Sequence, residues 1–201
     1  MFYSQQKEDE ILYNKYLNYK NGFFIEIGAM NGIDYSNTKF FEDNLVWNGI
    51  LIEPTSQFIE LEKNRPKCLN FNLAISEKIG EIEFIGKGAL SGCKESMSDS
   101  YKKLWGIDEK LSYKVKSVPF HVLTSKIDIK KVDLFSIDVE GGEIEVLNTF
   151  DWRIPVYIIL IELDTHNPDK DEKCREILRK RGFEFKLRIG SNDVWINREN
   201  I

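Results

Sequence analysis

The chain has 201 residues, 42% of them hydrophobic and 30% charged, which suits one folded domain rather than a disordered chain. Its 28 Lys and Arg against 33 Asp and Glu give a formal net charge of -5, which argues against a duplex-DNA partner because phosphate contacts need a basic face. No run approaches the ~20 apolar residues of a membrane-spanning helix, and the first residues lack the order of a signal peptide, so we expect a cytoplasmic protein without a membrane span.

Hydrophobic patterning predicts strands that alternate with helices along the chain. An N-terminal helix is expected from Lys7 to Lys20, within residues 1–21, and Asn21-Gly22 ends it. Apolar runs predict buried strands at residues 23–27, 49–53, 68–73, 132–139 and 156–162. Helices are expected at about residues 36–45, 56–63, 143–150 and 169–181, and a closing hairpin at 182–187 and 194–196. This alternation predicts an α/β fold with a mostly parallel sheet covered by helices on both faces.

The segment between the third and fourth of these strands has a different character. Residues 81–85 predict a strand of an antiparallel insertion, and residues 113–123 predict extended chain broken by Pro119. Gly and Ser gather between them with little periodicity, so we interpret residues 86–106 as a lid or substrate loop. No linker composition divides the chain, and a single domain over residues 1–201 is expected.

Four of the predicted strands end on or beside an acidic residue. Ligands of open α/β sheets bind beyond the carboxyl ends of the strands. Carboxylates gathered there repel one another unless a cation or hydrogen-bond donors are present. A binding site is therefore a simpler explanation than four separate helix caps. The four residues are Glu26, Glu53, Asp138 and Glu162.

The turn after the first strand favours a particular cofactor. Its glycines, Gly28 and Gly32, permit positive φ angles and let a ligand approach the backbone. Glu53 on the next strand can accept both hydroxyls of a ribose. A nicotinamide cofactor is one alternative, but the G-x-G-x-x-G spacing is absent and Glu26 would repel a pyrophosphate. The same carboxylate attracts the ammonium of S-adenosylmethionine (SAM), which we therefore expect as the cofactor.

Several segments together resemble the FkbM family of SAM-dependent methyltransferases. The most specific is Asp138-Val139-Glu140-Gly141-Gly142-Glu143, although the family usually has Ala at Gly142 and a smaller or polar residue at Met30. The other segments are Phe24 to Gly32, Ser36-Asn37-Thr38, Gly49 to Pro54, Asn72 to Ser76, Ile161-Glu162 with His166, and Asn192 to Trp195.

The resemblance implies a class I methyltransferase, Rossmann-like fold with seven strands, the last one antiparallel. It also implies methyl transfer from SAM to a hydroxyl oxygen, often on a sugar or polyketide. By matching positions, Glu26, Gly28, Gly32 and Asn37 would surround the methionine part of SAM, Glu53 would hold the ribose, and Leu73-Ala74 would lie near the adenine. Ala29, Asn31, Ser36, Pro54 and Asp138 complete the expected cofactor site.

Methylation of a hydroxyl benefits from a base within hydrogen-bond reach of its proton. Asp138 beyond the fourth strand, Glu140 and His166 are the candidates. Each has a structural alternative: Asp138 as a group that orders the cofactor or a loop, Glu140 as a stabiliser of the following turn or helix, and His166 as a solvated loop residue. We expect the acceptor to contact Ser91, Trp105, Glu162 and His166.

A divalent cation held by Asp138, Glu162, Asp164 and His166 is an alternative that their order permits and does not require, and no metal is expected. The leading interpretation is an O-methyltransferase that acts on a sugar or glycan, alone or with a glycosyltransferase. A polyketide or nucleic-acid ribose acceptor, and an inactive SAM-binding module, are the alternatives.

Overall fold

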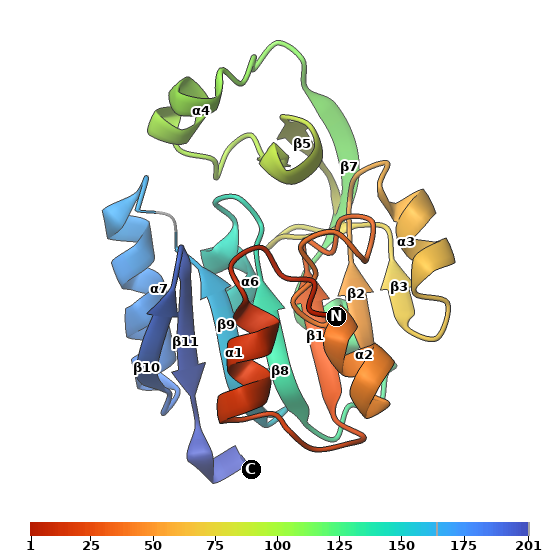
Figure 1. Ribbon diagram of the computed structural model, residues 1–201. Coiled ribbons are helices and arrows are strands. Elements are labelled where there is room, and N and C mark those ends of the chain that lie inside the picture. The colour runs from red at the N-terminus through yellow and green to blue at the C-terminus, as the bar shows by residue number, and fades with distance from the viewer. Residues whose placement is uncertain (164, 201) are drawn as a thin grey trace.

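A computed structural model of the chain describes residues 1–163 and 165–200, which form two sheets (Figure 1). The larger sheet has seven strands in the order β10-β11-β9-β8-β1-β2-β3. All neighbours are parallel except those of β11, which runs antiparallel to β9 and to β10. This order confirms the predicted α/β fold with the last strand antiparallel. The strands are β1 Phe23–Ile27, β2 Asn48–Ile52, β3 Leu69–Phe71, β8 Val132–Ile137, β9 Val156–Glu162, β10 Glu184–Ile189 and β11 Asn192–Ile196.

Both faces of this sheet are apolar and each is covered by helices, as the near-continuous hydrophobic strands predict. On one face, Phe24 and Leu51 pack with residues of α1 Glu8–Lys15, α2 Lys39–Leu45 and α3 Phe58–Asn64. On the other, Ile25 and Phe135 pack with residues of α5 Phe120–Thr124, α6 Glu143–Thr149 and α7 Pro168–Lys180. A short 3-10 helix, η2 Arg198–Asn200, follows the last strand. Among the described residues, no helix combines the length and the apolar character needed to cross a membrane.

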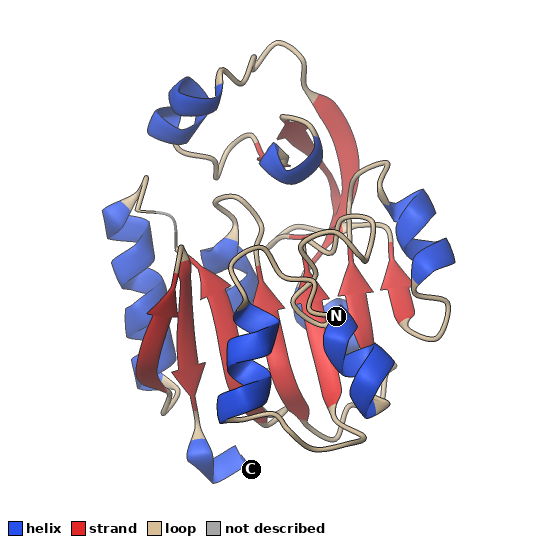
Figure 2. Cartoon of the chain, in the orientation of Figure 1, coloured by secondary structure: helices blue, strands red, loops and turns tan. Residues whose placement is uncertain are grey.

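A second, four-stranded sheet belongs to the insertion between β3 and α5, here called the cap (residues 74–118). Figure 2 shows the cap above the carboxyl ends of the parallel strands. The expected loop at residues 86–106 forms part of it, but the structure corrects its description because short elements interrupt the loop. The cap elements are β4 Ala74–Ile75, β5 Gly80–Ile85, η1 Gly88–Leu90, β6 Gly92–Cys93, α4 Asp99–Trp105 and β7 Tyr113–Val118.

Two other predicted boundaries differ from the structure. The N-terminal helix ends at Lys15 and is therefore shorter than predicted. The extended run at residues 113–123 ends at Val118, because Pro119 occupies the position before helix α5 and has no N–H to donate to a ladder. His121 therefore lies on a helix, where its Nδ1 is 3.1 Å from the Thr149 carbonyl oxygen.

Candidate functional site

A cavity of about 320 Å³ lies between the carboxyl edge of the large sheet and the cap. Its size falls at the lower end of the range of small-molecule sites. Three of the four predicted strand-end acids line it: Glu53, Asp138 and Glu162. Of the other predicted residues, Gly28, Pro54, Ala74, Ser91, Trp105, Glu140 and His166 also line the cavity.

The turn after β1 depends on Gly28. Its φ is +83°, and a Cβ atom there would lie 1.9 Å from the Asp138 carbonyl oxygen. The Gly28 N–H donates to the Ile52 carbonyl at 3.0 Å, so the turn also joins the ends of β1 and β2. Only glycine fits this junction, which brings the backbone of three strand ends together at the cavity wall.

Glu53 lies at the carboxyl end of β2 with its carboxylate held by the neighbouring backbone. One oxygen accepts the Met30 N–H at 2.9 Å and the other accepts the Thr55 N–H at 2.7 Å. Burial raises the pKa of Glu53, and these donors oppose that effect. Each carboxylate oxygen can accept a further hydrogen bond, so the geometry can serve a ligand with two adjacent hydroxyls.

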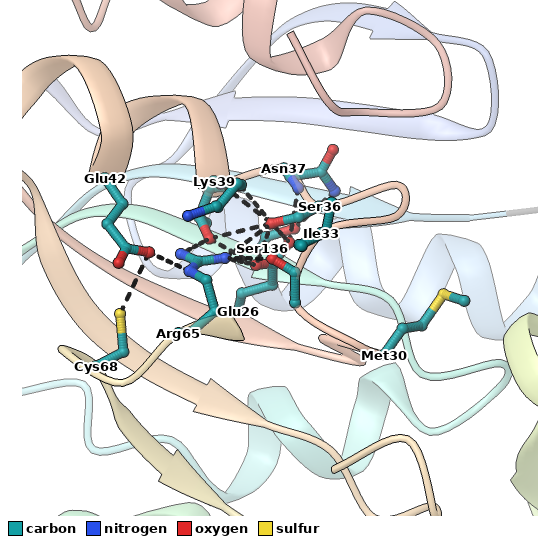
Figure 3. Close-up of polar contacts among 12 residues, drawn as sticks. Glu26, Met30, Ile33, Ser36, Asn37, Lys39, Glu42, Arg65, Cys68 and Ser136 are labelled. Carbon is teal, nitrogen blue, oxygen red and sulfur yellow. Dashed lines mark hydrogen bonds and ion pairs between the residues drawn. The ribbon is translucent and has the colours of Figure 1, made fainter. Parts of the chain in front are cut away.

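Glu26 is oriented differently from the expectation. Its carboxylate accepts the Thr38 hydroxyl at 2.6 Å, the Asn37 N–H at 2.7 Å and the Ser36 hydroxyl at 2.9 Å (Figure 3). These bonds turn Glu26 into the layer between β1 and α2, away from the cavity wall. Burial raises the pKa of Glu26, while the nearby Arg65 guanidinium lowers it. Glu26 is thus not among the residues that line the cavity, and its contact with the cofactor stays a prediction.

Arg65 contributes to this orientation, and no pattern in the sequence pointed to this residue. Its side chain is fully buried, with Nη1 3.9 Å from the Glu26 carboxylate and with an ion pair from Nε to Glu42. Arg65 Nη1 also donates to the Gly32 carbonyl at 3.0 Å, and a Cβ atom at Gly32 would lie 2.7 Å from Arg65 Cγ. Gly32 therefore leaves room for the Arg65 side chain. We call these residues, Glu26, Gly32, Ser36, Thr38, Glu42 and Arg65, the Arg65 network.

The remaining expected cofactor residues also lie outside the cavity lining. Asn37 donates from Nδ2 to the Ser136 hydroxyl at 3.0 Å, and Asn31 donates from Nδ2 to Asp34 at 2.7 Å. Ala29 belongs to the core beneath α2, and Leu73 packs at the margin of the opposite core. These residues shape the turns around the cavity without forming its surface.

Three carboxylates converge at the ends of β8 and β9. Asp138, Glu140 and Glu162 can each place one oxygen within 4.8 Å of the others, and we call them the carboxylate cluster. Burial raises the pKa of Asp138, and the charges of Glu162 and Glu140 raise it further. Such a cluster can hold a proton or a cation. Asp164, named above as a metal ligand, lies outside the described residues.

The Asp-Val-Glu-Gly motif supports this cluster through its backbone. Glu140 adopts a left-handed conformation with φ 52°, and Gly141 follows with φ +112°. A Cβ atom at Gly141 would lie 2.7 Å from the Ser96 carbonyl oxygen of the cap. The motif therefore aims acidic side chains at the cavity and lets the cap approach closely.

The cap contributes aromatic side chains to the same cavity. Tyr101 on α4 is buried, lies edge-on to the His166 ring with centroids 5.6 Å apart, and neighbours Trp105. Burial raises the pKa of Tyr101, and the adjacent Glu140 raises it further. The Ser100 hydroxyl donates to the His166 carbonyl at 2.7 Å, which ties α4 to the loop after β9. Sequence reasoning missed Tyr101 because α4 is too short to show a periodic pattern.

The amino-terminal residues were missed as well. Gln5 and Gln6 line the cavity, together with Tyr35 from the loop before α2 and Ser191 from the turn between β10 and β11. Nothing in the local sequence signals this role, because it follows from the path of the chain across the sheet edge.

Comparison with known proteins gives a family match and several similar folds. Residues 26–185 match the family model described as the methyltransferase FkbM domain. No curated protein matches the chain. The solved precorrin-6y C5,15-methyltransferase from Geobacter metallireducens is similar, with a TM-score of 0.47 and 12% identity over 97% of this chain and 92% of that chain.

Two further solved structures are similar at the level of the fold. M. capricolum TrmK in complex with S-adenosyl-homocysteine has a TM-score of 0.46 and 8% identity over 89% of this chain, which spans 62% of TrmK. Aeropyrum pernix fibrillarin in complex with SAM has a TM-score of 0.45 and 11% identity over 89% of this chain and 66% of that chain.

Proposed function

From the premise that the chain belongs to the FkbM family of SAM-dependent methyltransferases, we propose that it transfers a methyl group to a hydroxyl oxygen of a sugar or glycan. SAM supplies a methyl group already activated on a sulfonium. The residues of the chain then have two tasks, to align the acceptor oxygen with that methyl group and to receive the proton that the oxygen loses.

The cofactor end of the cavity lies at Glu53. Its carboxylate is fixed by two backbone N–H groups, one on each oxygen, and so is prepared to accept the two hydroxyls of a ribose. Ala74 and Ile75 supply an apolar wall beside it, where an adenine can pack. Gly28 leaves the turn after β1 without a side chain. These features fit SAM at this end of the cavity.

The single observation that carries oxygen methylation is the carboxylate cluster in the same cavity. A hydroxyl acceptor has a proton to lose, and a carboxylate of raised pKa is a stronger base than an ordinary one. Asp138, Glu140 and Glu162 can share that proton. Their negative charge also favours the sulfonium, which carries a positive charge next to the reacting methyl group.

Aromatic side chains at the cavity support a sugar acceptor. Trp105 is 53% exposed and Tyr35 is 52% exposed, yet both line the cavity. Exposed aromatic faces beside hydrogen-bonding groups suit a ring that carries hydroxyls and has an apolar C–H face.

The proposal is tested by methyl transfer from labelled SAM to a panel of sugars, phenols, polyketides, ribonucleosides and amines. We expect a sugar hydroxyl to be the best acceptor. Asp138→Asn removes a proton acceptor and should lower kcat by roughly 10²–10⁴-fold. The affinity for S-adenosylhomocysteine (SAH), measured by calorimetry, separates the two expected roles of Asp138: a value within about twofold of the unsubstituted protein assigns Asp138 to the proton, and a larger loss assigns it to the cofactor. Asp128→Asn, at an exposed position, is the control and should change neither quantity.

The pH dependence gives a second readout. Protonation of the cluster removes the base, so kcat should fall as the pH decreases, with a midpoint above the ordinary aspartate pKa of about 3.9. A best acceptor that reacts at nitrogen or carbon would contradict oxygen methylation. SAH binding without transfer to any acceptor would identify the chain as an inactive SAM-binding module.

A further inference from the structure

The N-terminal arm (residues 1–7) forms a wall of the cavity, although it precedes the segment that matches the family model. Gln5 and Gln6 line the cavity, and Ser4 forms a parallel β-bridge with Tyr35. The match begins at residue 26, downstream of the arm. Figure 1 shows it in dark red, crossing the upper part of the sheet before α1.

Two buried carboxylates hold the arm in place. Asp9 is 0% exposed and accepts the Tyr3 N–H at 2.6 Å and the Ser4 hydroxyl at 2.6 Å. Glu8 is 1% exposed, and it accepts the Gln6 N–H at 2.7 Å and the Asn192 Nδ2 at 2.9 Å. Hydrogen bonds to charged groups are stronger than neutral ones, so these contacts anchor the arm.

The turn between β10 and β11 is shaped to accept the Gln6 side chain. Gly190 has φ +56°, and a Cβ atom there would lie 1.3 Å from the Gln6 Oε1. The amide of Gln6 therefore occupies the space that any other residue at position 190 would fill. Ser191, next in the turn, lines the cavity beside it.

The arm lies far from the cofactor end. Gln6 contacts the turn that leads into β11, and Glu53 lies at the end of β2, four strands away in the sheet order. At about 4.8 Å per strand the two positions are separated by about 19 Å. A ribose held by Glu53 therefore leaves the Gln6 amide on the acceptor side of the carboxylate cluster, and Gln5, its neighbour in the chain, lines the same cavity.

We propose that the Gln5 and Gln6 side chains bind the acceptor and set its selectivity, an inference that rests on the proposed function for the identity of the acceptor. A glutamine amide offers both donors and an acceptor, so it can bind two neighbouring hydroxyls of a sugar. Tyr35, bridged to Ser4, places an aromatic face beside these amides. The arm and the cap then both contact the acceptor.

The experiment compares Gln5→Ala and Gln6→Ala with Gln57→Ala, using whichever acceptor in the panel the unsubstituted protein methylates best. Gln57 precedes α3, outside the cavity lining, and its Nε2 makes no hydrogen bond within the described structure, which makes it a matched control. Loss of one hydrogen bond should raise the acceptor KM by about three- to tenfold in each arm variant. SAH affinity and melting temperature should stay at the values of the control.

Each outcome bears on one proposal. A fall in SAH affinity at unchanged acceptor KM would assign the arm to the cofactor and overturn the inference. An unchanged acceptor KM together with unchanged SAH affinity would show that the arm side chains bind neither ligand, and would also overturn the inference. A best acceptor without hydroxyl groups contradicts the proposed function, yet a raised KM for that acceptor in the arm variants would still support the arm as its binding surface.

Discussion

Gly28 and Gly142 line the same cavity, but only Gly142 has room for a side chain. A Cβ atom at Gly28 would collide with the Asp138 carbonyl oxygen at 1.9 Å, and its φ of +83° disfavours any side chain. A Cβ atom at Gly142 would meet Val139 Cγ2 at 3.5 Å, an ordinary contact. The alanine that is usual at position 142 in the family therefore fits this chain as well.

Alanine substitution should separate these two glycines. Gly28→Ala forces either a shift of β8 or a strained turn, and we expect it to lower the free energy of unfolding by at least about 1–3 kcal/mol and to weaken SAH binding. Gly142→Ala should change the free energy of unfolding by less than about 1 kcal/mol. Urea denaturation and calorimetry measure both quantities. Equal behaviour of the two variants would contradict the geometry of the turn.

Sequence reasoning identified the site residues that follow directly from strand ends. Glu53 and Asp138 were predictable because parallel strands finish at one edge of the sheet, and both reach the cavity. Glu26 ends its strand in the same way, but hydrogen bonds from residues 36–38 hold its carboxylate, and Arg65, 39 residues further along the chain, lies 3.9 Å from it. A pattern of local residues contains no information about such a partner.

At the scale of the elements, the cap is the part of the fold whose secondary structure the sequence patterns predicted least well. The strands of the large sheet are apolar on both faces, so the runs at residues 132–139 and 156–162 predicted β8 and β9 closely. Helix α4 has seven residues. Ser98 is its N-cap residue, and the Ser98 hydroxyl accepts the Tyr101 N–H at 3.2 Å. So short a helix shows little periodicity, and it was predicted only as part of a loop.

The attachment of α4 to the loop after β9 can be tested through one hydrogen bond. Ser100→Ala removes the bond to the His166 carbonyl, worth about 1 kcal/mol, and should increase the rate of proteolysis within residues 86–106 by about fivefold. Bound acceptor should slow that cleavage if these residues act as a lid. Ser125→Ala at the end of α5, outside the cavity lining, is the control. Identical cleavage rates with and without acceptor would contradict the lid.

At the scale of the whole molecule, three segments far apart in the chain meet at one edge of the sheet. The N-terminal arm, the cap and the loop after β9 all contribute lining residues. The sequence predicted the sheet because each strand carries its own signal. The meeting of these segments depends on contacts across the fold, such as the bond between Asn192 and Glu8, and no single segment signals it.

A ligand that bridges these segments should stabilise the whole fold. SAH at 100 times its Kd adds about 2.7 kcal/mol to the free energy of unfolding, which corresponds to a rise in Tm of about 5–10 °C for a chain of this length. Differential scanning fluorimetry measures the shift. Glu53→Gln should reduce it by weakening the ribose contacts. NAD should give no shift, and a shift with NAD but none with SAH would favour the oxidoreductase alternative.

The inward orientation of Glu26 has a consequence for mutagenesis. Replacing it would leave the fully buried Arg65 with one carboxylate fewer, and would free the segment from Ser36 to Thr38 from its anchor. A drop in turnover together with a lower Tm would then report a loosened scaffold, because the Glu26 carboxylate lies outside the cavity lining. Glu26 variants therefore serve as a reference for indirect damage, against which the direct contributions of Glu53 and Asp138 can be judged.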